Sequence, residues 1–163
     1  VEAALTSVVP QNKKVLIVNN GAYGERMKQI CSAYEIGFVS YDIAPGNAVD
    51  LIVLEDMIKT HENVLSHVAF IHHETTVGIL NPLSEICHMS HKYGLENTVD
   101  AMSSFAGMDI DVERDQVDYL VSSSNKCIQG MAGISFVIAR LENLKKTSSI
   151  KRNFYFNLLA NYE

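Results

Sequence analysis

The sequence lacks three features that would each point to a particular class of protein. It has no excess of positive charge, because 13 lysine and arginine residues face 19 aspartate and glutamate residues, which gives a net charge of −6. Nucleic-acid binding needs a basic face to meet the phosphates, so this balance argues against it. No apolar run reaches the roughly 20 residues that a membrane-spanning helix requires. We therefore expect neither a nucleic acid nor a membrane as a partner.

Cysteine is also scarce, and metal-ligand patterns are missing. Cys31, Cys87 and Cys127 lack the spacing of a metal site, and their odd number leaves a free thiol. The six histidines are scattered, and the one adjacent pair, His72 and His73, should diverge because neighbours in sequence point in different directions. The sequence therefore predicts no metal site. Free thiols fit a reducing cytoplasm best.

What the sequence does contain is enough apolar material for a folded core. Hydrophobic residues make up 47% of the 163 residues, which is typical of a globular chain. There is no internal repeat and no low-complexity linker, and residues 145–152 are the one plausible domain edge. We expect a single domain over residues 1–163.

Apolar runs alternate with amphipathic stretches along most of the chain. The helical spacing of apolar residues, together with the glycines and prolines at the boundaries, predicts helices over 22–36, 49–62 and 81–94, the first of them ended by Gly37. The buried runs predict strands over 14–20, 37–43, 67–73, 98–102, 117–123 and 134–140. This alternation is typical of an α/β fold, with three layers (α/β/α) and a mostly parallel sheet.

Chemically capable side chains lie at or just beyond the ends of four of these strands. Tyr23 lies just beyond the first strand, Glu74, Thr75 and Thr76 follow the third, Asp100 lies within the short fourth strand, and Lys126 follows the fifth. Open parallel sheets bind ligands beyond the carboxyl ends of their strands, so one pocket could hold an aromatic ring, a hydroxyl group, a carboxylate and a lysine.

That set of groups suits pyridoxal phosphate. The cofactor needs a lysine to form a Schiff base with its aldehyde and a carboxylate to keep its pyridine nitrogen protonated. An aromatic ring can stack on its face, and a hydroxyl group can bond its phenolic oxygen. Lys126 also needs a lowered pKa to act as a nucleophile and proton carrier, and we expect partial burial and the cationic cofactor to supply that.

Each of these residues also has an ordinary structural explanation. Lys126 could be a surface lysine, and Asp100 could cap the next helix. Tyr23 could belong to the core, Thr75 and Thr76 could be turn residues, and Glu74 could be solvated. Their joint appearance at successive strand ends is what favours a cofactor site.

Four segments of the chain resemble the class V aminotransferases of fold type I, and among these the 2-aminoethylphosphonate–pyruvate transaminases most closely. The segments are "NGAYGER" (20–26), "HETTVGILNPL" (73–83), "VDAMSSF" (99–105) and "DYLVSSSNKCIQG" (118–130). They occur in order, with family-like spacing, over nearly the whole chain. The alanine–glyoxylate and serine–pyruvate transaminases are similar too, with a looser match around Lys126.

The resemblance implies a role for particular residues. Lys126 is the expected Schiff-base lysine and proton carrier, and Asp100 the expected partner of the pyridine nitrogen. Tyr23 matches the ring-stacking position, and Thr75 matches the hydroxyl near the phenolic oxygen. These four residues make up most of the expected pyridoxal phosphate site.

Two further positions match residues that line the cofactor in the family. Asn125 directly precedes the lysine, and Met102 lies on the other side of the cofactor ring. The implied reaction transfers the amine of 2-aminoethylphosphonate to pyruvate and gives phosphonoacetaldehyde and L-alanine. The resemblance also implies a homodimer with its active site at the subunit interface.

Some parts of the family pattern are not found in this sequence. The phosphate-holding loop should come just before "VEAALTSVV", and the small domain with its acid-binding arginine should follow "RNFYFNLLANYE". We therefore expect a fragment of the large domain. Within it, Glu96 and Asn97 are more polar than a buried strand predicts, and Ala132 stands where the family often has proline.

Three functions remain open at this point. One is a 2-aminoethylphosphonate–pyruvate transaminase, which "SSSNKCIQG" favours. Another is a class V transaminase that acts on alanine, serine or glyoxylate. The last is a noncatalytic α/β binding module.

Overall fold

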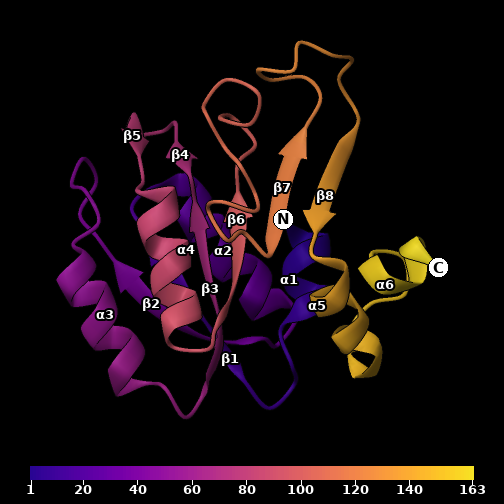
Figure 1. The fold of residues 1–163 in the computed structure, drawn as a ribbon, viewed down its shortest axis with the longest axis horizontal. Helices are drawn as coiled ribbons and strands as arrows, with labels where there is room; N and C mark the ends of the chain where they lie inside the picture. Colours follow the sequence, from indigo (N-terminus) through magenta and orange to yellow (C-terminus); the bar gives the residue numbers. More distant parts are fainter.

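Helices cover both faces of a central sheet in the computed structural model, which describes residues 1–163 (Figure 1). The helices are α1 (Glu2–Val8), α2 (Ala22–Ala33), α3 (Leu51–Thr60), α4 (Leu83–Lys92), α5 (Leu141–Lys146) and α6 (Leu158–Tyr162), with a 3₁₀ turn at Thr147–Ser149. The strands are β1 (Lys14–Asn19), β2 (Gly37–Asp42), β3 (Leu65–Ile71), β4 (His73–Glu74), β5 (Ile79–Leu80), β6 (Glu96–Asp100), β7 (Tyr119–Ser123) and β8 (Ser135–Ala139). The predicted three-layer α/β fold is confirmed.

The main sheet has the strand order β2-β1-β3-β6-β7-β8. All neighbouring strands are parallel except β7 and β8, which pair antiparallel with Leu120 opposite Ile138. The short β4 and β5 form a separate antiparallel pair. The prediction of a mostly parallel sheet is therefore correct.

The sheet has an apolar core on each face, because side chains of a strand alternate in direction. On β1, Val15 and Ile17 belong to the cluster that packs under α1 and α2. Leu16 and Val18 belong to the cluster under α3 and α4, which also contains Leu54. Both faces of β1 are buried, which accounts for its nearly continuous apolar sequence.

The chain reverses its direction of travel across the sheet between β1 and β3. From β1 it passes through α2 to the edge strand β2, and from β3 it passes through α4 to β6 on the other side. Beyond the carboxyl ends of β1 and β3, the chain therefore turns toward opposite sides of the sheet. This is the place where open α/β sheets bind ligands.

The end of α2 differs from the prediction. The helix stops at Ala33, and Glu35 adopts the positive φ of 54° that the sequence suggested for a glycine. Gly37 instead begins β2, where it pairs with Lys14. Gly94 does follow α4 with a φ of 68°, as its position predicts.

The polar residues of β6 are accommodated by hydrogen bonds. The Asn97 side chain is fully buried, and it donates to the Gln116 carbonyl (2.9 Å) and accepts from the Asp118 N–H (3.0 Å). The Asp118 carboxylate in turn accepts from the Asn97 N–H (2.9 Å) and from Asn143 Nδ2 (2.8 Å). Glu96 accepts from the Tyr119 hydroxyl (3.0 Å). These bonds join β6 to β7 at the amino-terminal ends of the two strands, away from the carboxyl ends where open sheets bind ligands.

None of the helices combines the length and the apolarity that crossing a bilayer requires.

Candidate active site

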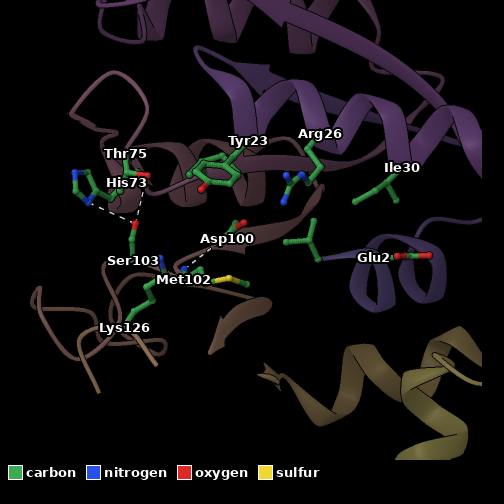
Figure 2. Close-up of a pocket in the computed structure, with 12 residues that line it drawn as sticks. Glu2, Tyr23, Arg26, Ile30, His73, Thr75, Asp100, Met102, Ser103 and Lys126 are labelled. Atoms are coloured by element: carbon green, nitrogen blue, oxygen red, sulfur yellow. Dashed lines mark hydrogen bonds between the residues drawn. The ribbon is translucent and has the colours of Figure 1, made fainter. Parts of the chain in front are cut away.

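A pocket of about 360 Å³ opens beyond the carboxyl ends of β1, β3, β6 and β7 (Figure 2). This volume lies in the range of small-molecule sites. Side chains from all four strand ends reach it, as the parallel sheet predicts. The residues that line it are Val1, Glu2, Tyr23, Arg26, Ile30, Ile71, His73, Thr75, Asp100, Met102, Ser103 and Lys126.

Asp100 ends β6 and is 7% exposed. Its Oδ1 accepts a hydrogen bond from the Met102 N–H (2.9 Å), whereas Oδ2 has no protein partner. Burial raises the pKa of Asp100 above its usual value, and the nearby charge of Glu74 adds to the rise, while the Met102 N–H and Arg26 oppose it. The site therefore contains a desolvated carboxylate with one oxygen free for a ligand.

Lys126 lies on the loop between β7 and β8. The Lys126 carbonyl accepts from the Gln129 N–H (2.8 Å), and the Gly130 N–H donates to the Ser124 carbonyl (2.7 Å), so residues 124–130 form a closed turn. The side chain points from this turn into the pocket toward Met102 (Figure 2). Lys126 is exposed, so the expected partial burial is wrong, because the turn extends beyond the end of the sheet.

Tyr23 lies in the first turn of α2, and its ring forms one wall of the pocket. The Arg26 guanidinium lies 5.4 Å from the centre of this ring, close enough for a cation to be attracted to the ring face. Both side chains come from one face of α2, since their positions are three apart in the sequence. Tyr23 thus offers a half-buried aromatic surface to a ligand.

The structure brings five of the six expected residues together. Thr75 and Met102 line the pocket with Lys126, Asp100 and Tyr23. Asn125 is not among the lining residues, and its Oδ1 accepts from the Ser123 hydroxyl (2.8 Å). The neighbouring Lys126 points into the pocket, whereas the Asn125 side chain forms a hydrogen bond at the start of the turn.

Seven of the twelve lining residues were not expected from the sequence, and three of these carry polar side chains that follow or flank the expected ones: Arg26, His73 and Ser103. His73 and Ser103 lie beside Thr75 and Met102, and the Ser103 hydroxyl donates to the His73 carbonyl (3.0 Å). Arg26 could have been found from its helical spacing to Tyr23. His73 and Ser103 follow the same strand ends as the expected residues, so their positions in the sequence already contained a signal.

The sequence profile of the family described as Aminotransferase class-V matches residues 1–153. The chain belongs to this family. The resemblance found in the four sequence segments is therefore confirmed.

Curated relatives of this chain are named for aminoethylphosphonate chemistry, and two of them serve as examples. The chain is 43% identical over its whole length to a bifunctional phosphonoacetaldehyde hydrolase/aminoethylphosphonate transaminase of Clostridioides difficile (strain 630), of which it covers 26%. It is 39% identical, again over its whole length, to a 2-aminoethylphosphonate–pyruvate transaminase of Bacillus cereus, of which it covers 47%. The chain thus spans less than half the length of these relatives.

Solved structures of class V aminotransferases share the fold. The chain resembles an alanine–glyoxylate aminotransferase from Nostoc sp. with a TM-score of 0.88 and 25% identity, over 99% of this chain and 44% of that one. A pyridoxamine–pyruvate aminotransferase from Mesorhizobium loti gives a TM-score of 0.85 and 27% identity, over 93% of this chain and 38% of that one.

Proposed function

We propose that this chain is the cofactor-binding part of a pyridoxal phosphate-dependent transaminase that moves the amine of 2-aminoethylphosphonate to pyruvate. The products would be phosphonoacetaldehyde and L-alanine. The observation that carries the proposal is the meeting of Lys126 and Asp100 in one pocket with the ring of Tyr23. The names of the relatives at 39% and 43% identity support the choice of substrates.

The donor set of the pocket fits pyridoxal phosphate. Lys126 is the one lysine that lines it, and Oδ2 of Asp100 is a free carboxylate oxygen on a buried side chain. The Tyr23 ring can stack on a flat heteroaromatic ring, and the Thr75 hydroxyl can donate to a phenolic oxygen. These are the groups that hold the ring and the aldehyde.

When bound, the cofactor would supply an aldehyde that accepts the amine and a protonated ring that stabilises negative charge on the substrate carbon. Asp100 would hold the proton on the pyridine nitrogen through Oδ2. Lys126 Nζ would accept the proton that leaves the substrate carbon and return it on the other side of the transfer. Its exposed stem leaves room for such a movement.

We extend the proposal to the organisation of the whole protein. Residues 1–163 would belong to the large domain, with the phosphate-binding loop and the acid-binding arginine supplied by other parts of the longer protein. The greater length of the relatives supports this. We also propose that the protein is a cytoplasmic homodimer. Asn125 remains a proposed cofactor-lining residue, in a conformation other than the one described above.

A second candidate is an alanine–glyoxylate type of transaminase, which the structural likeness to the Nostoc enzyme supports. The two candidates use the same lysine and carboxylate and differ in the amino donor. Single-turnover reactions of the full-length protein with 2-aminoethylphosphonate, alanine and serine would separate them. We expect 2-aminoethylphosphonate to convert the cofactor fastest, and a faster reaction with alanine would favour the second candidate.

The first test of the proposal is chemical trapping at Lys126. The chain is incubated with pyridoxal phosphate, reduced with borohydride and digested, and the modified peptide is found by mass spectrometry. We expect the label on Lys126, because this lysine alone has its amine inside the pocket. The label should disappear in Lys126→Ala.

Lys145→Ala is the matched control, because Lys145 is also exposed but lies outside the pocket. This variant should keep the label on Lys126. A label spread over many lysines would mean that the pocket does not organise the cofactor, and the noncatalytic α/β module would then be the better interpretation.

A further inference from the structure

Glu74 is a fully buried carboxylate that has no part in the proposed chemistry. Its Oε2 accepts from the N–H groups of Tyr23 (3.0 Å) and Gly24 (3.2 Å). Its Oε1 accepts from the Thr76 hydroxyl (2.6 Å) and the Thr76 N–H (3.3 Å). Burying a charge is costly unless it is fully hydrogen-bonded, so these four donors explain how the fold tolerates it.

The carboxylate lies at the start of α2, where the segment that follows β3 packs against the segment that follows β1. The helix has no cap from its own sequence, because Gly21 occupies the N-cap position. The N–H of Ala22 donates to the Thr76 hydroxyl (3.1 Å), and the next two N–H groups donate to Glu74. Residues 74 and 76 therefore satisfy the first three N–H groups of the helix, which would otherwise lack partners.

Gly21 is needed for this arrangement because of space. A Cβ atom at residue 21 would lie 2.4 Å from Glu74 Cγ and 2.8 Å from the Thr76 hydroxyl oxygen. Any larger residue would push the carboxylate away from the helix. The glycine of one segment and the glutamate of another, 53 positions apart, thus form one unit.

This unit fixes two walls of the pocket. The backbone N–H of Tyr23 donates to Glu74. Thr75 lies between Glu74 and Thr76, which are bonded to each other and to the start of α2. Glu74 itself is not among the lining residues. We propose that Glu74 is a positioning residue, which sets the Tyr23 ring and the Thr75 hydroxyl relative to each other and so controls how tightly the pocket binds a flat aromatic aldehyde.

A glutamine at this position could not replace the carboxylate. Both oxygens of a carboxylate accept hydrogen bonds, whereas an amide has one accepting oxygen and one donating NH₂ group. In Glu74→Gln, the NH₂ group would face either the Thr76 N–H or the N–H groups of Tyr23 and Gly24. In either orientation, the NH₂ group would face a backbone N–H, and neither of the two donors could accept a hydrogen bond from the other. The start of α2 would therefore shift away from residues 74–76.

The inference rests on the proposed function, and its main test is cofactor affinity in folded protein. Binding of pyridoxal phosphate to the chain is titrated by absorbance, with folding checked by far-UV circular dichroism. We expect the dissociation constant to rise about tenfold or more in Glu74→Gln, because a charge-assisted contact is lost. Thr76→Val should weaken binding too, and Thr76→Ser should restore it because the hydroxyl returns.

Asp118→Asn is the matched control. Asp118 is a carboxylate of similar burial, but it lies at the amino-terminal ends of the strands, away from the pocket. We expect this variant to lose stability and to keep its affinity for pyridoxal phosphate within about twofold. If Glu74→Gln and Asp118→Asn weaken binding in proportion to their loss of stability, Glu74 has only a structural role and the inference is wrong.

A second readout needs no cofactor. The chain has no tryptophan, so Tyr23→Trp introduces a single fluorescent reporter at the pocket wall. We expect the emission anisotropy of this reporter to fall when Glu74→Gln is added and to stay unchanged when Asp118→Asn is added. Unchanged anisotropy together with unchanged affinity would overturn the inference.

The outcomes also separate the inference from the proposed function. If the wild-type chain takes no label at Lys126, the proposed function fails, and the anisotropy alone then decides whether Glu74 positions Tyr23. If Lys126 is labelled and Glu74→Gln behaves like the wild type in both measurements, the proposed function stands and the inference fails.

Discussion

Asp100 destabilises the folded chain whenever it is ionised, although the proposed function needs its charge. Burial raises the pKa of Asp100, so the folded state holds this proton more tightly than the unfolded state does. The stabilisation that comes from binding this proton is fully present at pH values below the pKa of Asp100 in the unfolded state. It is lost as the pH rises through the higher pKa of Asp100 in the folded state. A ligand with a positively charged N–H group at Oδ2 would offset this loss.

We therefore expect Asp100→Asn to gain stability relative to the wild type as the pH rises from about 4 to about 7. The asparagine cannot ionise, so it avoids the desolvation of a charge. Urea denaturation at a series of pH values measures the difference in the free energy of unfolding. The same variant should bind pyridoxal phosphate more weakly than the wild type.

Asp56→Asn provides the comparison for this experiment, because Asp56 lies on the exposed side of α3. A stability difference for Asp100→Asn that does not change with pH would contradict the burial argument. A stability gain without weaker cofactor binding would mean that Asp100 does not face the cofactor.

The sequence revealed five of the twelve pocket residues but not the contacts that hold them. Asp100 and Lys126 could be predicted because the carboxyl ends of parallel strands share one edge of the sheet. Glu74 could be taken from sequence for a solvated carboxylate, and the structure buries it instead. Its burial depends on the missing side chain at Gly21, and no local pattern links two residues that lie so far apart in the chain.

At the scale of single elements, β6 is held by polar contacts where the pattern of buried strands predicts apolar ones. The Asn97 amide supplies partners to the Gln116 carbonyl and the Asp118 N–H, which are buried or half-buried. A buried backbone group without a partner costs about 1–3 kcal/mol. The polar side chain is thus a consequence of the backbone path of the neighbouring segment.

We expect Asn97→Leu to lower the free energy of unfolding by about 2 kcal/mol or more, although it makes β6 more apolar. The reason is that the two backbone groups of residues 116 and 118 lose their partner. Equilibrium urea denaturation at neutral pH measures this change.

Thr98→Val is the control on the next residue of the same strand. The Thr98 side chain is fully buried, and its hydroxyl has no hydrogen-bond partner. Replacing an unpartnered hydroxyl with a methyl group of the same shape should leave stability unchanged or raise it by about 1 kcal/mol. If both variants destabilise β6 equally, packing rather than hydrogen bonding explains the loss.

The order and type of the long elements could be predicted from the sequence, because apolar periodicity reports burial directly. The ends of elements were harder to predict. The end of α2 was assigned to Gly37, but Glu35 takes the left-handed conformation. Local propensity favours glycine there, and the pairing of Gly37 with Lys14 in the sheet decides otherwise.

At the scale of the whole molecule, two apolar patches face solvent at different ends. The loop patch, defined by Met131 (78% exposed) and Ile134 (56% exposed), lies on the same β7–β8 loop as Lys126. The C-terminal patch, defined by Phe154 (98% exposed) and Tyr155 (80% exposed), lies next to α6. Figure 1 shows the loop projecting beyond the sheet, away from α6. Exposed apolar patches of this kind commonly mark interfaces.

The proposed homodimer makes the loop patch the expected contact between subunits, because it adjoins the proposed active site. We expect the chain to self-associate in sedimentation velocity experiments as its concentration rises. The double variant Met131→Ser/Ile134→Ser should remove this association, and Phe154→Ser/Tyr155→Ser is the matched control. If the Phe154→Ser/Tyr155→Ser variant removes the association instead, the chains associate through the C-terminal patch and the dimer does not form through the loop. A wild-type chain that stays monomeric at high concentration would mean that these residues alone do not form the dimer.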